Sequence, residues 1–258
     1  MATESRAAPD WLRRLTVPMA VLVGLVVVVA WYVTWISSEV LGMGMMGVGF
    51  ALGAPELAAF YALLVVMMVA MMLPSALPMI LAYRGITRLE AGRPTRPADD
   101  VGTALFVLPY FAMWGAFSVV ALLGLVALGL VGPLSGPLVF LPAAVLLVAG
   151  TYQATRTKEV CLAHCQSPMG FVMHHWRSGR AGAARMGLRH SLYCIGCCWL
   201  FMLVLFVAGA MSLVWMGALS VAIFAEKVGT RPRATSLAIG ALLVFLGVLF
   251  AIQTALGA

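Results

Sequence analysis

The sequence predicts an all-α fold, a polytopic bundle of about seven transmembrane helices. Hydrophobic residues make up 63% of the 258 residues, charged residues make up only 10%, and the mean hydropathy is +1.04. A soluble globular domain would carry about 25% charged residues. Composition, long apolar runs and the spacing of the basic residues therefore all indicate one integral membrane domain over residues 1–258.

Seven apolar runs mark the predicted helices in order, most of them near the roughly 20 residues that a spanning helix needs. They cover residues 17–36, 56–83, 102–131, 138–155, 192–208, 211–226 and 237–256. The first follows a basic leader without a small-residue cleavage site, so we interpret it as an uncleaved anchor. The second contains Pro74 and Pro78, which predict a kink that either packs against a neighbour or borders a cavity. If one of the last runs is re-entrant, six spans remain.

The connections are short except for one, the segment 156–189 between the fourth and fifth runs. Gly132-Pro133 and Gly136-Pro137 indicate an outer turn between the third and fourth runs, and the fifth and sixth form a tight hairpin near residues 209–212. We expect the long segment to extend the fourth helix as far as Cys165 and to break at Ser167-Pro168. Its residues 169–176 mix apolar side chains with histidines, as an interfacial segment does.

Every lysine and arginine lies in an alternate loop. They precede the first run (Arg6, Arg13, Arg14) or follow the second (Arg84, Arg88, Arg93, Arg96), the fourth (Arg156, Lys158, Arg177, Arg180, Arg185, Arg189) and the sixth (Lys227, Arg231, Arg233). The positive-inside rule then predicts a multi-pass protein of the plasma (inner) membrane, with a cytoplasmic N-terminus and an external C-terminus. The orientation of the chain in the membrane thus explains the net charge of +7, and no nucleic-acid partner is expected.

All five cysteines and all four histidines lie between Cys161 and Cys198. Thiolate and imidazole are the ligands that soft transition metals select. On helices, Cys161 and Cys165 share one face, as do His190, Cys194, Cys197 and Cys198. We therefore predict a metal site at the cytoplasmic membrane surface, between the end of the fourth helix and the beginning of the fifth. The competing interpretation is that the cysteines are small apolar packing residues.

The individual ligands can be ranked. Cys161, Cys165, Cys194 and Cys198 are the strongest candidates, followed by Cys197 and His190, and then by His164. His174 and His175 are adjacent, so they cannot share a helix face, and an interfacial role beside Trp176 suits them equally.

The seventeen methionines gather at two places. Met43, Met45 and Met46 lie in the predicted outer loop, while Met67, Met68, Met71 and Met72 form two overlapping pairs one turn apart in the second run. Thioether is a soft ligand suited to Cu(I), so these residues could form a metal pathway towards the cysteines. For the second run, packing by an adaptable apolar side chain is the simpler interpretation.

Three motifs resemble a bacterial family of predicted metal-binding integral membrane proteins, the domain of unknown function 2182. They are Met67-Met68-Val69-Ala70-Met71-Met72-Leu73-Pro74-Ser75, Lys158-x2-Cys161-x2-His164-Cys165-x-Ser167-Pro168-x-Gly170-Phe171 and Gly187-Leu188-x-His190-x3-Cys194-x-Gly196-Cys197-Cys198-Trp199. The resemblance runs from the second apolar run to Glu226-Lys227, and it implies a membrane-embedded metal-binding protein.

We expect a protein that handles Cu(I), or less readily Zn(II), in transport, delivery or metalloprotein assembly. One alternative is a membrane thiol oxidoreductase that uses the Cys194/Cys197 dithiol, and another is a non-enzymatic subunit of a larger membrane complex. No nucleophile, base and acid constellation is visible, so we do not expect an enzyme. Glu226 and Lys227 are expected to snorkel at an inner helix end. The partners expected are the lipid bilayer and either a membrane complex or a second copy of the chain.

Overall fold

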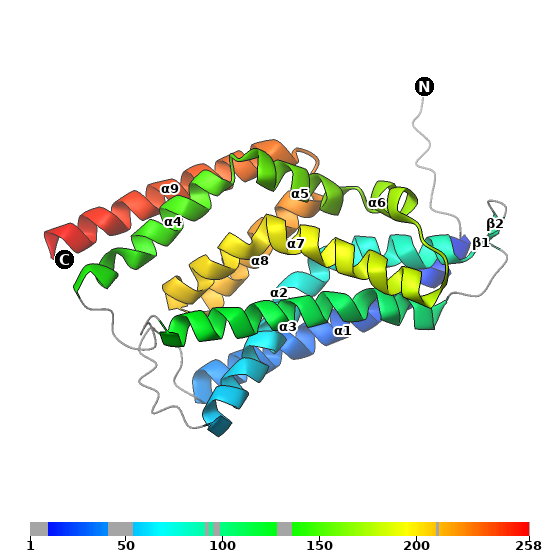
Figure 1. The fold of residues 1–258 in the computed structure, drawn as a ribbon, viewed down its shortest axis with the longest axis horizontal. Helices are drawn as coiled ribbons and strands as arrows, with labels where there is room; N and C mark the ends of the chain where they lie inside the picture. Colours follow the sequence, from blue (N-terminus) through cyan, green and yellow to red (C-terminus); the bar gives the residue numbers. More distant parts are fainter. Residues whose placement is uncertain are drawn as a thin grey trace.

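Helices carry nearly all of the chain that the structure describes. A computed structural model describes residues 10–40, 54–90, 93–94, 99–127, 136–209 and 212–257 (Figure 1). Its elements are α1 (Asp10–Val40), α2 (Ala54–Thr87), β1 (Leu89–Glu90), β2 (Arg93–Pro94), α3 (Asp100–Ala127), the 3-10 helix η1 (Gly136–Phe140), α4 (Leu141–Tyr152), α5 (Arg156–Gln166), α6 (Pro168–His175), α7 (Gly179–Gly209), α8 (Leu213–Val228) and α9 (Pro232–Leu256). The two short strands pair antiparallel, with Leu89 opposite Pro94.

Each of the seven predicted apolar runs is mainly helical in the part that the structure describes, but seven spans are not confirmed. Five helices in the described residues are long and apolar enough to cross a membrane, namely α1, α2, α3, α7 and α9, and the bent pair η1–α4 with α5 would make six. Helix α8 has 16 residues and so rises about 24 Å, which is less than a hydrocarbon core of about 30 Å. The structure thus supports a membrane protein with five or six long spans.

The fourth helix does not continue to Cys165 as expected. The chain turns by 67° between Tyr152 and Arg156. Thr155 has an extended backbone there, and its Oγ1 accepts a hydrogen bond from the Lys158 backbone N at 3.4 Å, which is the geometry of a helix N-cap. A strong capping residue therefore starts a new helix, α5, which lies against α7.

Helices α2 and α7 occupy the centre of the bundle. In each, 67% of the most apolar window is buried, against 17 to 28% in α1, α3 and α9. Helix α3 packs along α7, α1 along α2, and α4 along α9 (Figure 1). The α4–α9 pair approaches so closely at Gly150 that a methyl group there would lie 2.7 Å from the Gly240 carbonyl oxygen. Most side chains in the apolar parts of α2 and α7 are thereby removed from the surrounding solvent or lipid.

Candidate metal centre

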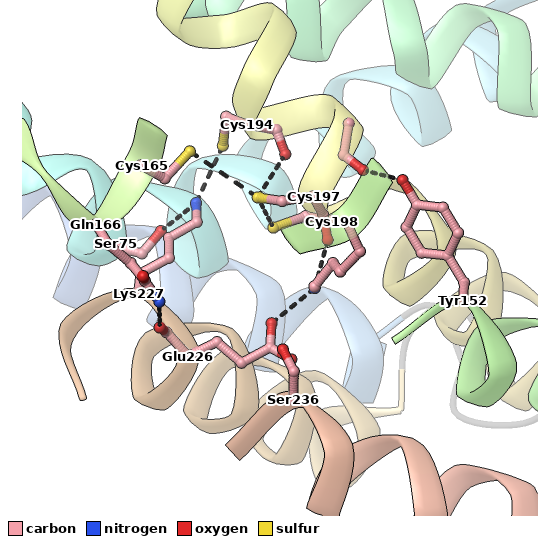
Figure 2. A network of polar contacts seen from close by, with 12 residues as sticks. Ser75, Tyr152, Cys165, Gln166, Cys194, Cys197, Cys198, Glu226, Lys227 and Ser236 are labelled. Atoms are coloured by element: carbon pink, nitrogen blue, oxygen red, sulfur yellow. Dashed lines mark hydrogen bonds and ion pairs between the residues drawn. The ribbon is translucent and has the colours of Figure 1, made fainter. Parts of the chain in front are cut away.

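Four buried cysteines from two helices meet beside the centre of the bundle. We call them the thiol cluster: Cys165 of α5 and Cys194, Cys197 and Cys198 of α7 (Figure 2). Their exposed fractions are 6% or less. The Cys197 Sγ lies 3.2 Å from the Cys198 Sγ and 4.0 Å from the Cys165 Sγ. The Cys194 sulfur is also within interaction range of the other three.

Helical spacing explains how α7 contributes three of these thiols. Residues three and four positions apart lie on the same helix face, so Cys194, Cys197 and Cys198 point the same way. The fourth thiol comes from α5 because the bend after α4 lays α5 along α7. Gly196 permits close contact between the two helices, since a methyl group there would lie 2.7 Å from the Cys161 Sγ. The Tyr152 hydroxyl donates to the Gly196 carbonyl at 2.6 Å and so holds the end of α4 against α7 at Gly196.

A lysine ammonium lies directly on the thiol cluster. The Nζ of Lys227, from α8, donates to the Cys194 Sγ at 3.1 Å and to the Ser75 Oγ of α2 at 3.1 Å (Figure 2). The Tyr110 hydroxyl of α3 lies 3.4 Å from the same sulfur. Lys227 is 6% exposed, and within the described residues its Nζ donates to one thiol and one hydroxyl. Because a buried ammonium needs a compensating negative charge, this arrangement favours a thiolate among the cysteines.

A second buried lysine is neutralised by a carboxylate. Lys158 Nζ lies 2.7 Å from the Glu226 Oε2 and donates to the Cys197 carbonyl at 2.6 Å. Glu226 also accepts from the Ser236 hydroxyl at 2.8 Å, and its backbone carbonyl accepts from the Gln166 side chain at 2.6 Å. The two charged side chains are each 1% exposed. This network joins α5, α7, α8 and α9 immediately below the thiols.

His190 is buried one turn before Cys194 and has no hydrogen-bond partner on either ring nitrogen among the described residues. It stacks on Tyr110 and Phe106, with ring centroids 5.7 and 6.1 Å away, and is 3% exposed. A buried imidazole without a partner is costly. Of the two predicted histidine ligands, His190 is the one with both ring nitrogens free of hydrogen bonds within the described residues.

The other predicted ligands lie outside the thiol cluster. Cys161 is half-buried and packs at Gly196. His164 stacks on Tyr193 at a centroid distance of 4.0 Å, with its Nδ1 2.8 Å from the Val160 carbonyl. His175 Nδ1 similarly lies 3.0 Å from the Phe171 carbonyl. The thiol cluster therefore contains Cys197, which was ranked second, and not Cys161, which was among the four strongest predicted ligands.

The helix that carries His190 to Cys198 begins earlier than predicted. We expected His190 to Cys198 at the beginning of a helix near residue 192, at the membrane surface. Helix α7 instead begins at Gly179, so Cys194 lies about 22 Å along it and inside the bundle. The polar run 179–191 is helical because it packs on α3, where Gly187 meets the Phe106 backbone.

The methionines of α2 border the same region. Met67, Met68, Met71 and Met72 are each 2% exposed or less. Met68, Met71 and Met72 lie one or two turns before Ser75, on the same side of the helix. The Tyr110 hydroxyl that touches Cys194 also donates to the Met72 carbonyl at 3.3 Å. Met43, Met45 and Met46 lie outside the described residues.

Sequence reasoning missed the charged groups of the site. Glu226 and Lys227 were expected to snorkel, which was wrong, because both are buried with partners from other helices. Lys158, Tyr110 and Ser75 were not predicted to be site residues. The available signal for Lys158 and Ser75 was their place in the motifs that resemble the family, and the resemblance extends to Glu226-Lys227. Tyr110 lies in none of the motifs.

In their present positions the thiols do not form a multidentate cage. Within the described ranges, no group of three or more Cys, His, Asp or Glu side chains has the arrangement of a metal site. Paired sulfurs such as Cys165 and Cys197 remain available to an ion that takes few ligands. A protein dithiol substrate could not reach Cys194 and Cys197, which are 0 and 2% exposed, so nothing in this geometry favours the oxidoreductase alternative.

Comparison with known proteins identifies a family. The sequence model of the family described as "PpoB2: Copper chaperone" matches residues 61–250, which include most of α2, the thiol cluster and both buried lysines. No curated protein and no solved structure gives a significant match.

Proposed function

This chain belongs to the PpoB2 copper chaperone family, and from that premise we propose that it holds Cu(I) at the thiol cluster within the membrane and hands it on during assembly of a copper protein. The observation that carries the proposal is the meeting of Cys165, Cys194, Cys197 and Cys198 beside the Lys227 ammonium. The resemblance to the domain of unknown function 2182 rests on the same cysteines, and we take the two groupings to describe one family.

Ligand type and ligand number both favour Cu(I) over Zn(II). Thiolate and thioether sulfur are soft donors, which suit Cu(I). A structural Zn(II) site is almost always tetrahedral with four nitrogen or sulfur ligands. Two thiolates are sufficient for Cu(I), so the sulfur pairs seen here suit Cu(I) without the cage that zinc requires.

Charge explains why lysines accompany the thiols. Two thiolates around one Cu(I) carry a net charge of −1, and an isolated charge inside a bundle is strongly unfavourable. Lys227, 3.1 Å from the Cys194 Sγ, supplies the compensating charge. Lys158 is less suited to compensate the charge of the copper thiolate, because Glu226 already neutralises it. We therefore assign Lys227 as the counter-ion of the copper thiolate.

Neighbouring soft donors provide a route to and from the thiols. Met68, Met71 and Met72 are buried on α2, and the unpartnered His190 lies one helical turn from Cys194. Exchange between donors of similar softness lets an ion move without full release. We propose that copper reaches the thiols past the α2 methionines and that His190 serves as an auxiliary ligand. The chain itself acts in the plasma membrane, and the recipient is a copper-dependent protein.

The test is the copper content of the full chain, purified in detergent under reducing conditions from copper-supplemented cells. We expect about one copper per chain, with the X-ray absorption edge of Cu(I). A variant in which Cys165, Cys194, Cys197 and Cys198 are all replaced by serine should lose that copper.

Cys161→Ser is the matched control, because Cys161 lies on α5 but outside the thiol cluster, and it should keep its copper. Equal copper in the fourfold variant and the parent would overturn the proposal. An equal loss of copper in Cys161→Ser would instead indicate that the copper site includes Cys161, at the outer edge of α5. Gel filtration of each variant confirms that copper is compared between folded proteins.

A further inference from the structure

A basic hollow lies at the beginning of α7, away from the thiol cluster. Its volume is about 390 Å³, and its lining includes His175, Arg177, Arg185, Leu188, Arg189 and Leu192. The Arg177 backbone N donates to the Met186 Sδ at 3.4 Å and holds the α6–α7 connection over the first turns of α7. The hollow is therefore built from two segments whose positions are tied together.

Three guanidinium groups line this hollow, and no carboxylate among the described residues neutralises them. The acidic side chains that the structure describes are engaged elsewhere: Asp99 caps α3, Asp100 pairs with Arg84, Glu159 with Arg233 and Glu226 with Lys158. The positive-inside rule accounts for the side of the membrane on which these arginines lie. It does not account for their convergence on one hollow.

Along α7 one stripe of the lining alternates between cationic and apolar side chains. Arg185, Leu188, Arg189 and Leu192 are spaced three and four residues apart, so they lie on one helix face. Leu188 and Leu192 are 42 and 54% exposed on that face. Two guanidinium groups beside two exposed leucines match a molecule that joins an anionic head to a hydrocarbon tail.

The length of α7 places this stripe at the membrane boundary. The part of α7 that could cross a membrane is 29 residues long, from Gly179 to Val207, whereas a hydrocarbon core needs roughly 20. Helix α8 begins at Leu213, so little chain is available beyond the far end of α7. The excess therefore lies at the Gly179 end. Counting roughly 20 residues back from Val207 reaches Leu188. Arg185 then lies at headgroup level, Arg189 lies at the boundary, from which a long cationic side chain can reach the headgroups, and Leu192 lies among acyl chains.

We propose that this hollow binds an anionic glycerophospholipid. Arg185 and Arg189 contact the phosphate, Arg177 closes the site from the α6–α7 connection, and Leu188 and Leu192 contact the first methylene groups. Basic pockets at the cytoplasmic ends of transmembrane helices bind anionic headgroups by such contacts. A free phosphate shares the headgroup chemistry, but it would leave the apolar half of the stripe unused.

Native mass spectrometry of the full chain in detergent provides the test. Phosphatidylglycerol and phosphatidylcholine with identical acyl chains are titrated separately, and inorganic phosphate is added as a competitor. We expect preferential retention of phosphatidylglycerol that millimolar phosphate does not abolish. In Arg185→Gln/Arg189→Gln the apparent affinity for phosphatidylglycerol should fall on the order of 10-fold or more, since each basic residue near a surface contributes substantially to anionic lipid binding.

The control is Arg156→Gln/Arg231→Gln, which removes two exposed arginines that do not line the hollow. It should retain phosphatidylglycerol like the parent. Equal retention of both lipids by the parent, an equal loss in the control, or full competition by phosphate would each overturn the proposal. The measurement needs no copper, so its outcome is independent of the proposed function.

Discussion

Lys227 Nζ and Cys194 Sγ lie 3.1 Å apart, although 33 residues separate them in the chain and each comes from a different helix. This contact places a cation on a thiol inside the bundle. Lys227 also reaches Ser75 of α2, so one side chain connects α8 with both central helices. In the proposed copper site, this pair balances the charge of the thiolates.

Replacement of Lys227 by methionine should weaken Cu(I) binding. The change preserves much of the side chain's length and packing but removes the cation beside Cys194. A hydrogen bond to a charged group is worth roughly 1.5–3 kcal/mol, which corresponds to a Kd about 10- to 100-fold higher. Competition with a Cu(I) chelator measures this, and Ser75→Ala, which leaves the lysine in place, should change the Kd far less. An unchanged Kd in Lys227→Met would remove Lys227 from the site.

Glu226→Gln should destabilise the bundle without acting on the copper ligands. It leaves Lys158 buried and uncompensated, and loss of one partner of a buried pair costs about 3–5 kcal/mol. The exposed pair Arg233–Glu159, at 2.6 Å, provides the comparison. There Glu159→Gln should cost less than about 1 kcal/mol. Unfolding by titration with a denaturing detergent measures both, and similar losses in the two variants would contradict a special role for the buried pair.

His190→Phe should keep the fold but reduce copper affinity. The phenyl ring can occupy the stack between Phe106 and Tyr110, and no hydrogen bond is lost among the described residues. Loss of an auxiliary ligand should raise the Kd about 10-fold or more, by analogy with residues that support metal ligands. His164→Phe is the control, because His164 stacks on Tyr193 outside the cluster. If both variants bind Cu(I) like the parent, His190 is a packing residue.

Gly150→Val should separate α4 from α9 and lower stability. Its side chain would meet the Gly240 carbonyl and Val244, with the first carbon 2.7 Å from each. Small residues allow such close approach of helices in membranes, and overpacking costs typically about 1–3 kcal/mol. Gly217→Val is the control, because nothing lies within 4 Å of a methyl group there. Thermal unfolding in detergent should show a lower midpoint only for Gly150→Val.

Local sequence predicted the helices well and their connections less well. Each of the seven apolar runs is helical, since a run of apolar residues in a membrane must satisfy its backbone hydrogen bonds internally. The break before α5 was missed because hydropathy does not report a capping threonine such as Thr155. The start of α7 was missed because residues 179–191 are too polar to count as a span. Their helix depends on α3, which approaches at Gly187.

The sequence by itself determined which residue types could meet: five cysteines, four histidines and the α2 methionines, at spacings that helices convert into shared faces. It also determined that three of the four clustered thiols would point the same way, because that follows from the period of α7 alone. Only the tertiary structure decided that Cys165 joins them while Cys161 does not, and that Lys227, Lys158 and Glu226 are buried rather than snorkelled. Those outcomes depend on partners 32 to 152 residues away. Charge burial is stable only where such partners converge, and no local pattern specifies that convergence.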